Sequence, residues 1–388
     1  MLYTVTIKNG EDSVRIHDRY ERIAEAKITR ERNSIDCLTF IIYPDNPGYE
    51  ALNRLTTTIE VVNGKTGKVD FEGRVVKAPA FMDSDGTIGK SVTCEGVEAY
   101  LCDSVQPYLA EQQWSGDSSR NGLQQFIDYV LARHNERVED HKKVYRGVVD
   151  LITYQTSQGV YKGLQRDSTR ETLQSKLVDV FGGEMRVRRS SDDGKLYLDY
   201  SEKLGDDSST TIELAQNMAS ATLDEEPTQV ITRLYPLGKK PDGSDDYLTI
   251  ASVNSGKEYI EDADAKAVYG VIEGTHIWED MTVAANLKSA AQSWLPINNQ
   301  FPTSAAVDAY DLSLIDLAPE EFRLYDWYQV KNSLIGLDQS LEVVKQVIDI
   351  NEPHNSTIEL GDSTYVQSSK ATAAIASRVK VLEKMLGI

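Results

Sequence analysis

The first hundred residues alternate apolar and polar side chains with a period of two, and this pattern limits the fold more than any other feature. Period two is typical of β-strands that bury one face. The predicted strands are residues 2–8, 35–43, 57–62, 69–77 and 88–95. Segments 44–48 and 83–86, rich in proline, glycine and aspartate, are predicted turns between them. The start of the chain therefore predicts a β-domain.

The periodicity changes to that of a helix after residue 105. Five apolar residues form one stripe of a predicted helix: Leu123, Phe126, Ile127, Val130 and Leu131. A second helix is predicted to begin at a capping box, Ser168 to Glu171, and to stop at the glycine pair 182–183. Its expected buried stripe is Leu173, Leu177, Val180 and Phe181. With a predicted hairpin over 184–200, these patterns indicate a separate α/β unit.

A third region begins near residue 229. It predicts a strand at 230–237 and a polar loop at 238–246. A helix is expected over 282–295, ended by Pro296. Its apolar face is predicted to carry Val283, Leu287, Ala291 and Trp294. Further strands are predicted at 306–315, 328–331 and 341–350.

Two stretches share the layout strand, loop, strand, turn, strand. The first comprises 59–63, 71–75 and 91–96, and the second comprises 328–332, 341–345 and 356–361. Two interpretations stay open, a structural duplication or the chance likeness of two β-meanders. The duplication predicts a β-rich α+β fold with two related β-barrel domains, an inserted α/β domain and a C-terminal helix. The expected domains are 1–105, 106–210, 211–365 and 366–388.

The end of the chain is rich in alanine and carries a short heptad seam. The seam residues are Ile375, Val379, Leu382 and Leu386. Two turns of seam do not hold a coiled coil alone. The segment is either the start of a three-fold stalk or a helix packed on the body.

Charge and cysteine usage exclude several classes of protein. With 41 basic and 61 acidic residues the net charge is −20, which argues against tight binding to DNA. Cys37, Cys94 and Cys102 are an odd number in apolar surroundings, so buried free thiols and folding in a reducing cytoplasm are expected. Neither a membrane-spanning run nor a secretory signal is found in the sequence.

Searches for catalytic and metal-binding motifs give no candidate site. The five histidines are His17, His134, His141, His276 and His354, and none lies in a His-Glu-x-x-His motif. His134 and His141 are interpreted as a solvated helix end. Neither Gly-x-Ser-x-Gly nor a phosphate-binding glycine loop occurs. The acidic segments 83–86 and 242–246 lack the spacing of a calcium loop and are predicted to be plain turns. We therefore expect no catalytic residue, metal or cofactor.

Three aromatic residues lie close together near the end of the third region. They are Tyr325, Trp327 and Tyr328. Aromatic faces stack on sugars, so a saccharide-binding surface is one interpretation. Strand residues that pack into a core are the other.

The order of several short motifs resembles one known family. They include Phe-Glu-Gly-Arg-Val at 71–75, Cys-Glu-Gly-Val-Glu-Ala-Tyr-Leu-Cys-Asp at 94–103 and Thr-Arg-Leu-Tyr-Pro-Leu-Gly at 232–238. The chain resembles the tail-associated hub proteins of siphophages and prophages, named "prophage endopeptidase tail" proteins. Its layout is also similar to the trimeric baseplate hub of contractile-tailed phages. One departure is Leu324-Tyr325-Asp326 where the family commonly has Leu-Gly-Asp, so the turn there is expected to be built differently.

The resemblance implies a structural protein of the virion tail tip, assembled in the cytoplasm of a host bacterium. It implies a homotrimer whose two barrel domains per chain form a six-part ring below the distal tail protein. The tape-measure protein and then the phage DNA would pass through this ring, without specific binding or membrane insertion by the chain.

The family name also implies alternatives. One is a peptidoglycan-degrading endopeptidase, and the other is a host-surface saccharide binder. Lytic domains in the family usually follow the hub region, and Ile388 stands where such an addition would begin. Receptor-binding or lytic tail components are therefore expected as partners, and the chain itself is expected to be no enzyme.

Overall fold

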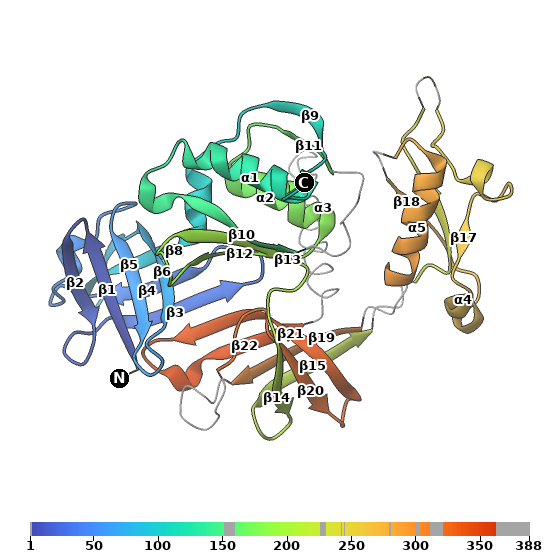
Figure 1. The fold of residues 1–388 in the computed structure, drawn as a ribbon. Coiled ribbons are helices and arrows are strands. Elements are labelled where there is room, and N and C mark those ends of the chain that lie inside the picture. Colours follow the sequence, from blue (N-terminus) through green and yellow to red (C-terminus); the bar gives the residue numbers. More distant parts are fainter. Residues whose placement is uncertain are drawn as a thin grey trace. The chain divides into compact units, whose positions relative to one another are not determined.

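The computed structural model describes residues 2–150, 160–225, 230–241, 243, 245–278, 281–298, 303–310 and 321–361. The chain divides into two compact units, which are described separately. Unit 1 comprises residues 1–220 and 307–360, and unit 2 comprises 221–306 and 361–388. The predicted β-rich α+β class is confirmed (Figure 1). Within the described ranges, no helix is long and apolar enough to cross a membrane.

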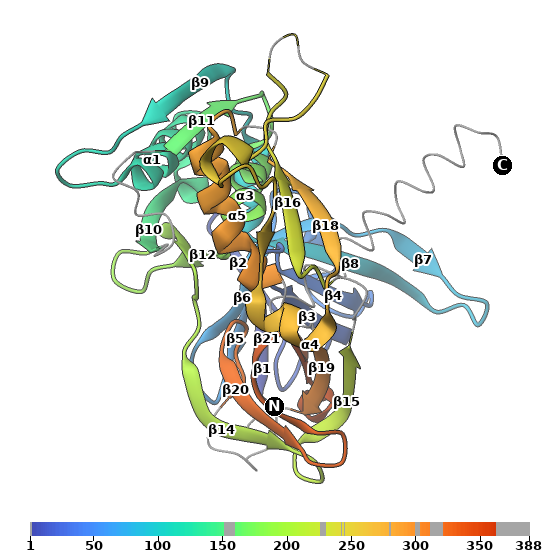
Figure 2. The ribbon, with the colours of Figure 1, turned by 90° about the vertical axis from the view of Figure 1, so that its right-hand side faces the viewer.

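The largest sheet contains 14 strands, eight from residues 3–96 and six from residues 207–361. Its N-terminal strands are β1 (Tyr3–Asn9), β2 (Asp12–His17), β3 (Ala24–Glu31), β4 (Cys37–Ile42), β5 (Thr58–Asn63), β6 (Val69–Lys77), β7 (Ala80–Met82) and β8 (Ile88–Gly96). Its C-terminal strands are β14 (Asp207–Glu213), β15 (Met218–Glu225), β19 (Thr303–Tyr310), β20 (Trp327–Asn332), β21 (Leu337–Asp349) and β22 (Thr357–Gly361). Figure 2 shows the β7–β8 hairpin extending out from this sheet.

Six strands of each half follow the same spatial order. The order is β1-β5-β6-β8-β4-β3 in the N-terminal half and β14-β20-β21-β22-β19-β15 in the C-terminal half. Each strand of one set has its counterpart at the same place along the chain in the other. The pairs β5–β6 and β20–β21 are antiparallel, as are β4–β8 and β19–β22. The likeness of the two stretches in the sequence therefore reflects two related β-regions, called the N repeat and the C repeat below.

The two repeats are joined by one pair of strands. The end of β21 pairs with β3 in antiparallel register from Glu31 opposite Lys345 to Lys27 opposite Asp349. Ile348 and Ile350 from this end are buried in the same apolar cluster as Ile28. Because the ladder and the core are shared, neither repeat buries its apolar face alone.

The chain between the repeats forms a compact α/β region. Its elements are β9 (Leu109–Trp114), α1 (Gly122–Asn135), β10 (Val144–Asp150), β11 (Val160–Leu164), α2 (Thr169–Leu173), the π-helical turn η5 (Gln174–Val178), α3 (Asp179–Phe181), β12 (Glu184–Arg189) and β13 (Leu196–Ser201). Strands β10, β13 and β12 form one sheet, and β9 pairs with β11.

Helix α1 confirms the predicted apolar stripe, because all five of its stripe residues are buried. The second predicted helix is also present, as the run α2, η5 and α3. Its capping box is only half formed: the Ser168 side chain accepts a hydrogen bond from the backbone N–H of Glu171 at 3.1 Å. Leu173 and Leu177 are buried as predicted, and the side chain of Val180 lies outside the described residues. Gly182 ends the helix at φ +73°, a conformation that costs glycine little.

Unit 2 is a small sheet with a helix packed on it. It contains β16 (Arg233–Leu237), β17 (Ile260–Glu261), α4 (Ala263–Tyr269), β18 (Glu273–Ile277) and α5 (Ala284–Asn298). Its core is small and centres on Leu234, Ala291 and Leu295. Two predictions were wrong here. Val283 precedes α5 and is exposed, and α5 continues past Pro296, because a proline in the last turn removes only one helix hydrogen bond.

Short 3₁₀ turns complete the described fold. They are η1 (Tyr49–Ala51), η2 (Val97–Asp103), η3 (Asp140–Lys142), η7 (Ala251–Val253) and η9 (Pro353–Asn355). The predicted C-terminal helix at 366–388, with the seam Ile375, Val379, Leu382 and Leu386, lies outside the described residues.

Candidate binding cavity and adjoining buried junction

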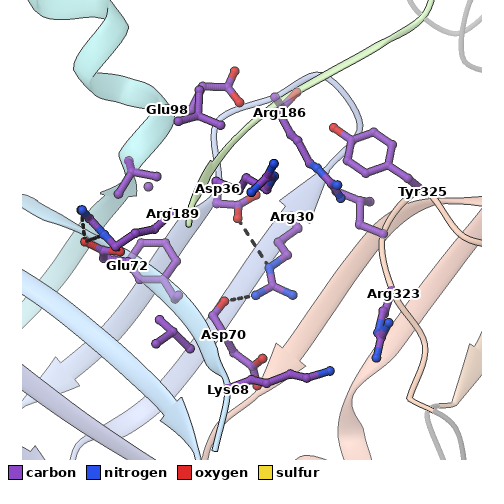
Figure 3. Close-up of a pocket in the computed structure, with 18 of the residues that line it drawn as sticks. Arg30, Asp36, Lys68, Asp70, Glu72, Glu98, Arg186, Arg189, Arg323 and Tyr325 are labelled. Carbon is purple, nitrogen blue, oxygen red and sulfur yellow. Dashed lines mark hydrogen bonds and ion pairs between the residues drawn. The ribbon is translucent and has the colours of Figure 1, made fainter. Parts of the chain in front are cut away.

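A cavity of about 410 Å³ opens in unit 1 where several segments converge. Its walls come from β3 and the turn after it, from the start of β6, from the end of β8 and the start of η2, from β12, and from the segment 321–325 before β20 (Figure 3). The N repeat, the α/β region and the C repeat therefore all contribute side chains. The sequence did not predict this site, because its residues are up to about 300 positions apart.

The lining reverses the charge balance of the chain. Six lining residues are basic: Arg30, Lys68, Arg186, Arg188, Arg189 and Arg323. Five are acidic: Asp36, Asp70, Glu72, Glu98 and Glu321. In the whole chain, acidic residues outnumber basic ones by 61 to 41. Cations are thus concentrated here.

Most of the lining carboxylates already have a cation partner. Arg189 binds Glu72 with a shortest contact of 2.5 Å. Glu98 lies 2.5 Å from the guanidinium of Arg170, on α2. Burial raises the pKa of Glu98 to about 7, and the charge of Arg170 opposes this shift. These pairs leave part of the basic lining without an ionic partner.

Arg30 is held firmly in the floor of the cavity. Its Nη1 donates to Oε1 of Gln346 at 3.0 Å, its Nη2 donates to the backbone carbonyl of Asp70, and its Nε lies 3.5 Å from Asp36. Figure 3 shows the guanidinium between Asp36 and Asp70. Since β3 and β21 are neighbours, the same strand pairing that joins the repeats also fixes this side chain.

Among the described residues, two cations of the cavity lack an ion-pair partner, and one carboxylate oxygen lacks a hydrogen-bond donor. Lys68 and Arg323 are exposed, and neither forms an ion pair within 4 Å in the part of the chain that the structure describes. Asp70 is only 8% exposed, and its Oδ2 has no hydrogen-bond partner among the described residues. Burial raises the pKa of Asp70, and nearby Arg30 and a side-chain hydrogen bond with Asn63 lower it less, so Oδ2 alone is the atom without a partner in the described chain. Buried acceptors without a donor are uncommon in folded proteins.

Asn33 ties the N repeat to the α/β region beside the cavity. It lies in the turn between β3 and β4 with φ +55°. Its side chain donates to the carbonyl of Gly183 at 3.1 Å and accepts from the N–H of Met185 at 2.8 Å. Arg170 donates to the carbonyl of Asn33 at 2.6 Å. The turn is therefore fixed by contacts with two elements distant in sequence.

Tyr325 completes the same junction and has a left-handed backbone, with φ +75°. The family that the sequence resembles commonly has glycine here, so a tyrosine keeps the glycine-like conformation at a cost in backbone strain. Its hydroxyl donates to the carbonyl of Met185 at 3.1 Å and accepts from the N–H of Asn33 at 3.2 Å. These bonds offset the strain.

The aromatic trio is mostly core. Tyr325 is 4% exposed and Tyr328 is 1% exposed. The ring of Tyr328 packs edge-on against Phe322 at 4.8 Å, and Lys203 lies over the ring of Trp327 at 5.0 Å. The packing interpretation therefore fits these residues better than an exposed sugar-stacking face.

A buried acidic pair also holds the three regions together. Arg32 lies 3.4 Å from Glu184 on β12 and 3.4 Å from Glu342 on β21. Both carboxylates are almost fully buried. Burial raises the pKa of each, and their mutual repulsion raises the pKa of Glu342 further. Arg32 thus faces two carboxyl groups whose raised pKa favours the protonated form.

The histidines do not form a catalytic or metal site in the described chain. His134 was predicted to be solvated, but it is fully buried, because it faces a polar network instead of water. Its Nδ1 lies 2.7 Å from the hydroxyl of Ser104, and its Nε2 lies 3.1 Å from the carbonyl of Lys142. Ser104 is 4% exposed, so this serine–histidine contact is closed to a substrate.

The other histidines lie apart. His17 is buried, and burial lowers its pKa to about 4. His141 contacts the ring of Tyr100, and His354 lies in η9. His276 stacks on Trp294 in unit 2 at 4.5 Å. No group of three metal-ligating side chains occurs in the residues that could be described.

The cysteines follow the prediction only in part. All three are free thiols. Cys94 is buried as expected, but Cys102 is exposed and Cys37 is half-buried. Cys102 is exposed because it lies near the end of η2, after the turn's buried residues Val97 to Leu101. Burial raises the pKa of all three thiols, which makes them less reactive.

Comparisons with known proteins agree with the resemblance seen in the sequence. Residues 206–366 match the model of the family described as prophage endopeptidase tail. A comparison with curated protein sequences finds no match.

Solved structures of three tail proteins share the fold over nearly their whole length. The 43 kDa tail protein of prophage MuSo2 from Shewanella oneidensis is 14% identical with a TM-score of 0.60, covering 92% of this chain and 97% of that one. Prophage tail protein gp18 from Listeria monocytogenes is 12% identical with a TM-score of 0.61, covering 97% and 99%. A tail protein from Neisseria meningitidis is 12% identical with a TM-score of 0.55, covering 94% and 97%. The chain therefore has the fold of prophage tail proteins.

Proposed function

We propose that the chain is a structural hub of a phage tail tip, and that three copies close the end of the tail tube. The observation that supports this most directly is the repeated strand order within one chain. Three copies with two similar β-regions each supply six similar segments around one axis. Such a ring can meet a six-fold tube on one side and present three-fold symmetry on the other.

The partners follow from this placement. A six-fold distal tail protein would lie above the ring, and receptor-binding or lytic components would lie below. The tape-measure protein and then DNA would pass along the axis, and a net charge of −20 per chain disfavours retention of DNA there. The protein would assemble in the cytoplasm of the host bacterium and act in the virion tail tip during cell wall penetration.

The domain boundaries belong to the same proposal. Residues 1–105 and 211–365 would form the two tube domains, 106–210 the inserted α/β domain, and 366–388 a C-terminal helix. In the trimer, Ile375, Val379, Leu382 and Leu386 would meet around the three-fold axis as the first turns of a stalk.

Oligomer mass tests the proposal. Light scattering and native mass spectrometry at micromolar concentration should give three times the 43.3 kDa chain mass, and electron microscopy of assembled tails should show one ring at the tip. A monomer in solution together with no ring in the tail would refute the hub.

A structural role also predicts no peptidoglycan cleavage. The only serine–histidine contact among the described hydrogen bonds, Ser104 with His134, is buried, which supports this view. Zymography on host cell walls should show no clearing at high protein concentration. Clearing that Ser104→Ala abolishes would instead favour an endopeptidase.

A further inference from the structure

We infer that the cavity in unit 1 binds an acidic polypeptide segment. The inference names a class of partner for the proposed tail hub and rests on that function only for the source of the segment. Binding itself depends on residues of one chain, so it can be tested whatever the oligomer.

The cations of the cavity favour a ligand that carries a carboxylate. Lys68 and Arg323 both line the cavity, one from just before β6 in the N repeat and one from the segment before β20 in the C repeat. Figure 3 shows the Lys68 side chain extending towards the segment that carries Arg323. Neither has an ion-pair partner in the described structure, so a carboxylate between them would gain charge-assisted hydrogen bonds that are now unmade.

Asp70 favours a ligand that also carries a hydrogen-bond donor. Its Oδ2 is buried at the cavity and accepts no hydrogen bond from any described residue. This oxygen needs a donor, and a peptide N–H is one. A ligand that joins an acceptor carboxylate to N–H donors within a few ångströms has the chemistry of an acidic peptide.

The remaining lining disfavours a highly charged anion. Besides Asp70, the walls contain four more acidic side chains, Asp36, Glu72, Glu98 and Glu321. Closely spaced phosphates would be repelled by these carboxylates, whereas a peptide places single charges among neutral amides. The apolar residues Val69, Val97 and Leu324 also line the cavity and suit the Cβ and Cγ atoms of a peptide. A volume of about 410 Å³ lies in the range of small-ligand sites and accommodates a few residues.

A direct binding assay tests the inference on the full chain. The probe is a fluorescein-labelled peptide of alternating glutamate and glycine, six residues long, followed by fluorescence anisotropy at low salt. The matched probe has glutamine in place of glutamate. We expect the acidic peptide to bind at least tenfold more tightly than the neutral one.

Two variants of equal charge change locate the binding site. Lys68→Gln with Arg323→Gln removes both unpaired cations and should weaken binding of the acidic peptide at least tenfold. Arg133→Gln with Arg137→Gln removes two cations of the α1 end, outside the cavity lining, and should change binding less than twofold. Because all four side chains are at least partly exposed, the variants should fold, and circular dichroism verifies this.

Other outcomes of these assays would contradict the inference or the proposed hub. Equal binding of the two peptides, or equal weakening by the two double variants, would overturn the inference, because either would mean nonspecific attraction. Tight binding of tripolyphosphate that displaces the peptide would replace the peptide by a phosphorylated ligand. A monomeric protein that binds the peptide as expected, together with no ring in the assembled tail, would refute the hub and leave the inference standing.

Discussion

The N repeat and the C repeat share a strand order but differ in what connects their second and third strands. In the N repeat, β3 and β4 are joined by the five-residue turn 32–36. In the C repeat, the counterparts β15 and β19 are separated by residues 226–302, which include most of unit 2. The first strand also differs, since β1 is antiparallel to β5 whereas β14 is parallel to β20.

The connection between the second and third strands is therefore a short turn in one repeat and a long insertion in the other. A strand pair tolerates a long insertion between its strands because loop-closure entropy grows slowly with length. The short turn of the N repeat instead places Asn33 and Arg32 against β12 and β21. The strand order is thus the common frame, and the connections distinguish the repeats.

The largest effect is expected from core truncation in either repeat. Leu38 on β4 and Leu341 on β21 are both fully buried. Leu38→Ala and Leu341→Ala should each lower the free energy of unfolding by about 2–5 kcal/mol, because each leaves a cavity in a close-packed core. Urea denaturation followed by circular dichroism measures this. A near-zero change for one of the two would show that the repeats do not share stability equally.

A smaller loss is expected at the turn that only the N repeat has. Asn33→Ala removes two hydrogen bonds and leaves a β-carbon at positive φ, so we expect a loss of about 3 kcal/mol in the free energy of unfolding. Asn33→Gly keeps the backbone relaxed and isolates the hydrogen bonds. A glycine variant as stable as the wild type would mean that these bonds contribute nothing.

The buried pair Glu184 and Glu342 predicts a pH effect. Burial raises the carboxyl pKa in the folded state, so the folded protein holds a proton that the unfolded chain has released, and stability falls as pH rises above the ordinary carboxyl range. Arg32 and Lys203 limit this fall by favouring the charged form. Glu342→Gln should therefore gain about 2 kcal/mol relative to the wild type between pH 5 and pH 8.

The control for this experiment is Glu359→Gln on β22. Glu359 is partly exposed and lies 3.6 Å from Lys345. Its difference from the wild type should stay constant within about 0.5 kcal/mol over the same range, as expected of an exposed ion pair. A flat difference for Glu342→Gln as well would show that the buried pair does not hold an extra proton.

The smallest effect is expected from the hydroxyl of Tyr325. Tyr325→Phe keeps the ring and removes the bonds to Met185 and Asn33, so it should lower the free energy of unfolding by about 1 kcal/mol. Tyr20→Phe, at a tyrosine that is 81% exposed, serves as the matched control and should have no effect. Equal free energies of unfolding for the two variants would show that the Tyr325 hydroxyl does not stabilise the connection between the repeats.

Local sequence patterns were sufficient for much of the fold. The stripe from Leu123 to Leu131 and the stop at Gly182 were predictable because spacing and backbone freedom act within one turn. The paired stretches left a duplication and a chance likeness open, and the shared strand order favours the duplication. Strands β2, β3, β7, β9 to β11, β14, β15, β17 and β18 were not predicted.

The cavity and the junction could not be predicted in the same way. Arg30 and Gln346 meet across 316 positions, and no local pattern encodes a contact of that separation. The run Met-Arg-Val-Arg-Arg at 185–189 was the one visible sign of a basic surface. The buried position of His134 was missed because Ser104, its partner, lies 30 residues away.

The pairing of β3 with the end of β21 has a consequence for synthesis of the protein. During translation, the N repeat leaves the ribosome with one edge of β3 unpaired until residue 349 has been made. An unpaired strand edge is a template for pairing with other chains. The end of β21 thus completes the pairing of the N repeat, and nascent chains held before β21 should aggregate or recruit chaperones, whereas full-length chains should not.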